Sequence, residues 1–274
     1  MEKQIIWRGL LAGAIAGVLA FLFARIFVEP QIDLAIGYEE GVGAAHEALE
    51  AAAHGGHAHG HSHGDEGGIT RAVQANVGLG LGLLAFSTAI GALFAVVYAV
   101  AYGRVGNISA RMLSLLIAGG MLLSLYVVPT LKYPASPPAL SLDETIQQRT
   151  LLYLLMVALS AVLLVGAVYV GRLLVGRLGT WNAALAAAGG YVVAVGVLML
   201  VLPSINETPG PLVDDNGTIV YEGFPADVLY EFRLYSLGTQ VVVYATIGLV
   251  FAAMVSRLLG ERKQALPTEV SDLR

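Results

Sequence analysis

Residues 77–102 read VGLGLGLLAFSTAIGALFAVVYAVAY, a stretch without a single charged side chain. An α-helix rises about 1.5 Å per residue, so roughly 20 apolar residues cross a hydrocarbon core about 30 Å thick. Lipid offers the backbone no hydrogen-bond partner, and an apolar segment of this length must satisfy its own peptide groups. The stretch is therefore predicted to be a transmembrane helix.

Five more stretches of similar character occur along the 274 residues. Together the six are Ile5–Val28, Val77–Tyr102, Met112–Leu131, Thr150–Gly171, Leu178–Leu202 and Leu234–Ser256. Only 13% of the residues are charged, whereas about a quarter are charged in a soluble domain. The sequence thus predicts an all-α integral membrane protein, a bundle of about six transmembrane helices in one multi-pass domain over residues 1–274.

Charge and motif content exclude several classes of function. The chain has no cysteine, which removes disulfides and thiolate metal sites. Its basic residues are few and scattered, so we expect no nucleic-acid partner. No nucleotide-binding loop, H-E-x-x-H motif or paired nucleophile and base is present, and we expect no enzyme activity and no permanently bound cofactor.

Basic residues are distributed unevenly between the two sides of these spans. With the N-terminus inside, the inner side holds Lys3, Arg8, Arg104, Arg111, Arg172, Arg177, Arg257, Arg262, Lys263 and Arg274. The outer side holds only Arg25, Arg71, Lys132, Arg149 and Arg233. Positive residues favour the cytoplasm, so the chain is predicted to lie in the plasma (inner) membrane with both termini cytoplasmic. Short turns, at 103–111 and 172–177, then face inward, and long loops, at 29–76, 132–149 and 203–233, face outward.

All six histidines fall in the first outer loop, within the segment 46–66. The candidate ligands are His46, Glu50, His54, His57, His59, His61 and His63. The first three are spaced by four and would share one helical face, whereas the rest alternate with small residues in a flexible run. Neutral imidazole binds zinc, copper, nickel and cobalt. The segment predicts metal capture, and a solvated linker with biased composition is the alternative.

Acidic residues also gather at the predicted outer ends of the helices. Glu29, Asp33 and Glu207 are candidates for an oxygen-rich cation site, since six packed helices would bring them to one level beside basic residues. Ordinary ion pairing at the membrane interface is the other reading. No Asp, Glu, His or Lys lies near the middle of a span, so a cation would cross along hydroxyl and carbonyl groups or with another chain's help.

Two smaller patterns predict local structure. Gly9, Gly13 and Gly17 recur at steps of four and make a smooth face for close helix packing. The stretch VDDNGTIVYEG at 213–223 predicts a β-hairpin with Asn216-Gly217 in its turn.

Several motifs in fixed order resemble the CbtA family of predicted cobalt transporter subunits. They are FARIFVEPQID at 23–33, KYPASPPAL at 132–140, TIQQRTLLYL at 145–154, WNAAL at 181–185, LPSINETP at 202–209 and FPADVLYEFRLYSLGTQ at 224–240. The resemblance covers nearly the whole chain. It implies bacterial cobalt uptake linked to cobalamin synthesis and a small single-span partner of the CbtB type that has its own histidines. The family is described with five spans, whereas six are counted here.

These observations lead to one functional prediction and one rival. The first is a transporter subunit for a divalent transition metal, cobalt before nickel or zinc, whose partners are the metal ion, the bilayer and a CbtB-like subunit. The rival is a membrane metal-binding sensor or scaffold protein that transports nothing.

Overall fold

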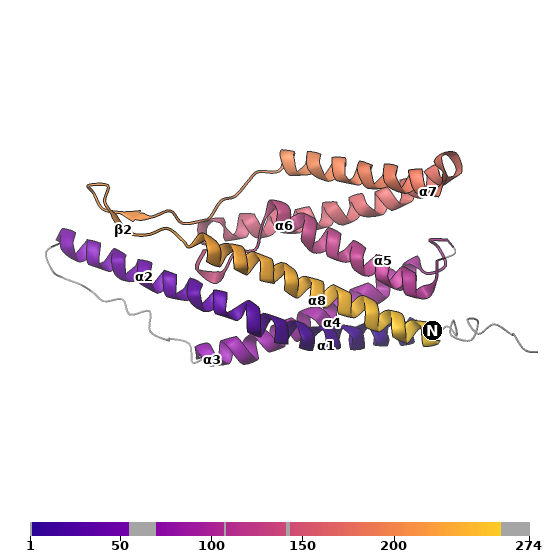
Figure 1. Ribbon diagram of the computed structural model, residues 1–274, viewed down its shortest axis with the longest axis horizontal. Helices are drawn as coiled ribbons and strands as arrows, with labels where there is room; N and C mark the ends of the chain where they lie inside the picture. Colours follow the sequence, from indigo (N-terminus) through magenta and orange to yellow (C-terminus); the bar gives the residue numbers. More distant parts are fainter. Residues whose placement is uncertain (1, 55–69, 107, 141–142, 259–274) are drawn as a thin grey trace, which may run out of the picture. The chain divides into compact units, whose positions relative to one another are not determined.

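Long helices make up most of the chain in the computed structural model, which describes residues 2–54, 70–106, 108–140 and 143–258 (Figure 1). Within these residues, five helical segments are long and apolar enough to cross a membrane. They are Lys3–Phe27, Arg71–Ala101, Ala110–Lys132, Thr145–Val201 and Ala226–Leu258. Each predicted apolar stretch lies in one of them to within one residue at its end, and this confirms the all-α membrane class.

The fourth segment is a hairpin of two helices. It belongs to α7 (Asp143–Val201), whose helical geometry is interrupted at Gly179 with φ 73° and ψ 166°. Glycine alone enters that region without a steric penalty. The arms run side by side in Figure 1, and the hydroxyls of Ser160 and Tyr191 lie 2.8 Å apart between them. Counting α7 twice gives six crossings.

The predicted turn at residues 172–177 is wrong by a few positions. Helix α7 continues through this stretch and breaks only at Gly179. The arginines, leucines and valines between Gly171 and Gly179 are compatible with a helix, and charge at a membrane interface does not by itself end one. The break falls where a positive φ is available at no cost.

The remaining elements comprise five further helices of 13 residues or more and several short segments. They are α1 (Glu2–Phe27), α2 (Glu29–His54), α3 (Arg71–Val73), η1 (Gln74–Gly78), α4 (Leu79–Ala101), α5 (Ala110–Leu122), η2 (Leu123–Val127), α6 (Val128–Lys132), η3 (Pro138–Leu140), β1 (Leu212–Val213), β2 (Ile219–Tyr221) and α8 (Ala226–Leu258). The segment 29–76 was expected to be a loop, but its residues 29–54 form the continuous helix α2.

Contacts divide the chain into two units. Unit 1 contains Met1–Leu22, Val77–Leu122 and Thr239–Arg274, and unit 2 contains Phe23–Asn76 and Leu123–Gly238. In unit 1 the predicted glycine face of α1 packs on α4. A methyl group on Gly17 would lie 2.8 Å from the Leu84 Cα, and Gly9 and Gly91 approach each other backbone to backbone. The glycines therefore serve tight static packing.

Both ends of the membrane part lie at one end of unit 1. Gly9 near the start of α1 faces Gly91 in the second half of α4. The Phe94 ring of α4 meets the Phe251 ring near the end of α8, with centroids 5.1 Å apart. In unit 1, therefore, the start of α1 and the end of α8 lie at the same end of the helices.

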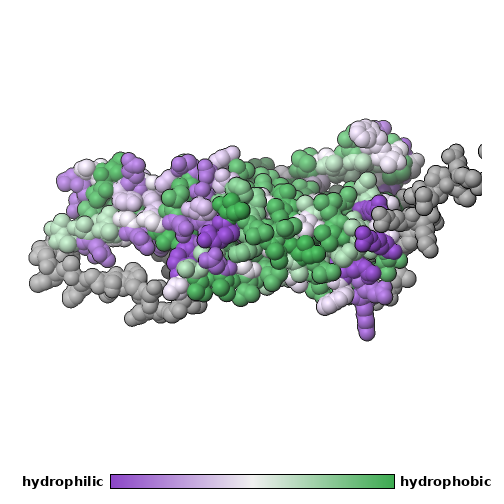
Figure 2. All heavy atoms as spheres, turned by 60° about the horizontal axis from the view of Figure 1, so that its bottom comes forward, coloured by the Kyte–Doolittle hydropathy of each residue, from purple (hydrophilic) through white to green (hydrophobic). Residues whose placement is uncertain are grey.

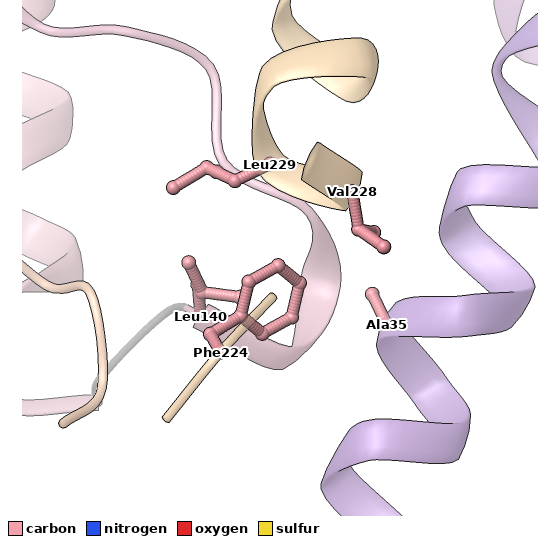
Figure 3. Close-up of a cluster of buried hydrophobic side chains, with 5 residues drawn as sticks. All are labelled: Ala35, Leu140, Phe224, Val228 and Leu229. Carbon is pink, nitrogen blue, oxygen red and sulfur yellow. The ribbon is translucent and has the colours of Figure 1, made fainter. Parts of the chain in front are cut away.

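In unit 2 a small apolar cluster fixes α2 to the start of α8. Ala35 of α2 lies on the side of Val228 and Phe224, and Leu140 of η3 and Leu229 complete the group (Figure 3). All five side chains are less than a tenth exposed. Burial of this apolar surface stabilises α2, which is not among the helical segments long and apolar enough to cross a membrane.

The predicted hairpin is present and contacts α2. Strands β1 and β2 pair antiparallel, and Gly217 takes φ 80° in the turn. The Tyr38 ring of α2 packs edge-on against Tyr221 of β2, with centroids 5.6 Å apart. Burial, and secondarily the neighbouring Tyr221, raises the pKa of the Tyr38 phenol. The hairpin thus holds the middle of α2 in place.

Large apolar side chains remain at the surface of the membrane helices. Examples are Leu11, Leu81 and Leu200, each more than half exposed. The face in Figure 2 is accordingly green over much of its helical surface. An exposed apolar surface of this extent is expected where the solvent is lipid.

Candidate functional site

The carboxylates of Glu29 and Asp33 share one cation, the guanidinium of Arg71. Arg71 Nη2 hydrogen-bonds to Glu29 Oε1 and lies 2.8 Å from Asp33 Oδ1. The Glu29 side chain is 2% exposed, whereas that of Asp33 is 62% exposed. One face of this group is therefore buried and the other open to solvent.

Local sequence explains why these groups meet. Helix α1 ends at Phe27 and α2 begins at Glu29, with Pro30 in its first turn, where no donor is needed. Glu29 and Asp33 are four residues apart and share one helix face. On the other side, the Thr70 hydroxyl accepts a bond from the Val73 N–H and starts the helix that carries Arg71.

Arg71 is incompletely satisfied. Its Nε is buried and has no hydrogen-bond partner among the described residues, although Nη2 serves both carboxylates. An unpaired buried donor costs free energy, so this guanidinium is held less firmly than one with every donor engaged.

Further polar contacts join the same end of α2 to its neighbours. The Gln31 amide donates to Glu231 Oε2 of α8 at 2.8 Å. Arg25 Nε donates to the Asn76 side-chain oxygen at 3.1 Å. The start of α2, the residues after position 70 and the first turns of α8 thus form one polar layer.

The Glu207 carboxylate sits in a second cluster. It accepts bonds from Arg149 at 2.6 Å and from the Thr145 hydroxyl at 2.5 Å. Arg149 also donates to the Pro134 carbonyl at 2.6 Å and to the Ser136 hydroxyl at 2.9 Å. Glu207 is thereby tied to the proline-rich loop between α6 and α7.

A cavity of about 330 Å³ lies beside Arg149. Its walls include Tyr126 and Tyr153, together with Thr130 and Thr150. Tyr126 belongs to η2, a π-helical turn within an otherwise α-helical segment, and such turns are frequent at functional sites. The cavity thus combines aromatic rings, hydroxyls and one guanidinium.

The predicted oxygen ligands are brought together only in part. Glu29 and Asp33 meet on Arg71, but no hydrogen bond or ion pair between described residues links either of them to Glu207. Every one of the three carboxylates has an arginine partner. This geometry fits ion pairing and leaves no preformed cation site composed of all three.

The histidine residues are described only in part. His46 and Glu50 lie exposed on α2, four residues apart, and the helix continues to His54. The predicted helix over this stretch is confirmed. His57, His59, His61 and His63 lie outside the described residues. Within the described ranges, no group of three or more His, Asp or Glu side chains is placed to hold a metal ion.

Sequence reasoning missed the partners that bind these carboxylates. Arg71 entered it only through its charge, and Thr145, Gln31 and Glu231 only as members of the quoted family motifs. The four-residue spacing of Glu29 and Asp33 was the available signal for a shared cation. Nothing in the sequence connects it to a residue 42 positions away from Glu29.

Comparison with known proteins gives one match. The family model described as "Probable cobalt transporter subunit (CbtA)" matches residues 2–256, nearly the whole chain. No curated protein and no solved structure matches.

Proposed function

Since the chain belongs to the CbtA family of probable cobalt transporter subunits, we propose that it takes part in cobalt uptake across the plasma (inner) membrane of a bacterium, for cobalamin synthesis. The family match over residues 2–256 is the observation that carries the proposal. Cobalt is the cargo rather than a resident cofactor, and the subunit performs no chemistry on it. The excess of Lys and Arg on one side supports cytoplasmic termini.

Helix α2 presents the first metal ligands outside the membrane. The apolar cluster at Ala35 and the ring contact of Tyr38 hold its first half. His46 and Glu50 lie exposed on its second half. The histidines that follow extend this ligand set, and they collect dilute ions at the entrance.

From there, ions reach the carboxylates of Glu29 and Asp33. A divalent cation competes with the singly charged Arg71 guanidinium for the same oxygens. The 62% exposure of the Asp33 side chain gives an ion from solution access to this carboxylate. Two carboxylates do not complete the coordination of a transition metal, so the other ligands come from water or histidine. Glu207 takes part as a second oxygen site.

A partner subunit completes the path. The spans of this chain carry no carboxylate or imidazole near their centres. A small single-span subunit with its own histidines, of the CbtB type, supplies the missing ligands.

Uptake of radioactive cobalt by a transport-deficient bacterial host tests the carboxylate site. We expect Glu29→Gln with Asp33→Asn to lower uptake at limiting cobalt by at least tenfold, because both ligands are lost. The matched control is Glu39→Gln with Glu40→Gln, which removes the same charge from exposed positions of α2. Equal uptake by the two double variants, at equal membrane expression, would exclude a role for Glu29 and Asp33 as ligands.

A further inference from the structure

A second cavity lies in unit 1, between α5 and α8. Its volume is about 330 Å³. The lining residues include Arg111 and Leu115 of α5, and Leu249, Ala252, Ala253 and Arg257 of α8. It involves none of the residues of the candidate metal path, which all belong to unit 2.

Helix packing explains where this cavity forms. The Ser114 hydroxyl donates to the Gly248 carbonyl at 2.9 Å, and a methyl group on Gly248 would lie 2.7 Å from the Ala118 Cβ. These contacts bring the two helices close together. The cavity lies beyond them, toward the start of α5 and the end of α8, where Ala252 and Ala253 leave space that a larger side chain would fill.

Neither of the two guanidiniums at this cavity has an acidic partner among the residues that the structure describes. Arg111 is the second residue of α5 and Arg257 is the next to last of α8. All three ion pairs among the described residues are in unit 2. Apart from Glu2, the described part of unit 1 contains no Asp or Glu.

Helix electrostatics favours Arg257 in the last turn of α8 but disfavours Arg111 in the first turn of α5. The N-terminus of a helix carries a partial positive charge and attracts negative groups. Arg111 adds a full positive charge at that end of α5. An anion placed between Arg111 and Arg257 offsets both the repulsion and the unpaired charges.

Apart from Ser256, whose hydroxyl donates to the Ala253 carbonyl, the rest of the lining is apolar, and this identifies the class of anion. Leu115, Leu249, Ala252 and Ala253 offer a hydrocarbon surface next to the two guanidiniums. A small inorganic anion would leave this surface unused, whereas a phospholipid fills both parts. Basic pockets between transmembrane helices bind lipid headgroups in this way. We propose that the cavity binds an anionic phospholipid, its phosphate between Arg111 and Arg257 and an acyl chain along Leu115 and Leu249.

The test uses the full chain purified in detergent and supplied with phosphatidylglycerol or phosphatidylcholine. Native mass spectrometry counts the lipids that remain bound. We expect the protein to retain phosphatidylglycerol in preference to phosphatidylcholine. Arg111→Gln with Arg257→Gln should lower the apparent affinity by roughly thirtyfold, the loss of two arginine contacts.

Two controls separate a built site from general attraction. Arg172→Gln with Arg177→Gln removes equal charge from exposed positions of α7. This variant should retain phosphatidylglycerol in preference to phosphatidylcholine, as the unmodified protein does. Ala253→Trp keeps both guanidiniums but fills the cavity, so this variant should retain less phosphatidylglycerol than the unmodified protein. The thermal midpoint of each variant, measured without added lipid, verifies that it is folded.

Three results would overturn the proposal. The first is equal retention of the two lipids by the unmodified protein, and the second is equal losses of phosphatidylglycerol in the two double-arginine variants. The third is displacement of phosphatidylglycerol by millimolar inorganic phosphate with no effect of Ala253→Trp, which would assign the site to a free anion.

Discussion

Arg149 and Glu207, 58 positions apart in the chain, form a hydrogen-bonded ion pair of 2.6 Å, with side chains only 19% and 4% exposed. Arg149 also binds the Pro134 carbonyl, and Arg233 binds the Ala135 carbonyl at 3.2 Å. The pair therefore connects the start of α7, the segment after its end and the proline-rich loop. We expect the folding stability of this part of unit 2 to depend on the ion pair.

Removing one partner should be costly, since it leaves the other charged and buried. Arg149→Ala should lower the free energy of unfolding by about 3–5 kcal/mol. The apparent unfolding midpoint in detergent measures the effect. Lys132→Ala, which loses only a bond to Ser204 at an exposed position, is the control and should cost less than about 1 kcal/mol. Equal shifts for the two variants would mean that the pair contributes little.

Close helix packing in unit 1 should make Gly91 sensitive to a single methyl group. A Cβ at Gly91 would collide with the backbone of Gly9 and Gly13, so Gly91→Ala must separate α1 from α4. Gly82, on the same helix, has open space around its Cα, and Gly82→Ala should be neutral or slightly stabilising. Membrane-inserted yield and thermal midpoint compare the two. A tolerated Gly91→Ala would contradict the packing of α1 on α4.

Ser87 should be replaceable at no cost. Its side chain is fully buried and its hydroxyl has no hydrogen-bond partner among the described residues. Loss of an unsatisfied buried polar group is neutral or stabilising, so Ser87→Ala should leave the thermal midpoint unchanged or raise it. A drop equivalent to more than about 1 kcal/mol would show that the hydroxyl has a partner.

The hairpin should weaken in acid. The Thr218 N–H, and after it the Asn216 N–H, donate to the Asp214 carboxylate at 2.7 and 3.0 Å and hold the pKa of Asp214 below its usual range. A lowered pKa means that the charged form stabilises the folded turn. This contribution is complete above the ordinary pKa of about 3.9 and is lost as the pH falls through the lowered value.

Hydrogen exchange of residues 212–221, corrected for intrinsic rates, tests this pH dependence. Protection should fall between pH 6 and pH 3 in the unmodified chain. With Asp214→Asn it should be low at both pH values, and with Asp215→Asn it should follow the unmodified chain. If protection of these residues does not change with pH, the charge of Asp214 does not stabilise the turn.

Hydropathy predicted most of the fold, because a lipid-embedded chain has few options. Apolar length alone located the five helical segments that are long and apolar enough to cross a membrane, and the Asn216-Gly217 pair located the hairpin. Of helix α2, only the part from His46 to His54 was predicted to be helical, because no long apolar run marks the rest. It is held by a handful of distant contacts, such as Ala35 with Phe224, which a single sequence does not reveal.

The candidate site was less accessible to sequence reasoning. The residue types and the spacing of Glu29 and Asp33 were visible, but the pairing with Arg71 depends on where the chain returns after the histidine segment. The sequence placed Glu207 with them on the expectation of one outer layer. The structure gives Glu207 its own arginine instead.

The central claim is that this chain is needed to move cobalt. Accumulation of radioactive cobalt in a transport-deficient host, with and without a single-span partner of the CbtB type, tests it most directly. Uptake that requires the chain, and that falls at low cobalt when all six histidines are replaced by Ala, is the predicted result. No accumulation in any combination, despite membrane insertion and metal binding, would contradict the claim and favour a sensor or scaffold.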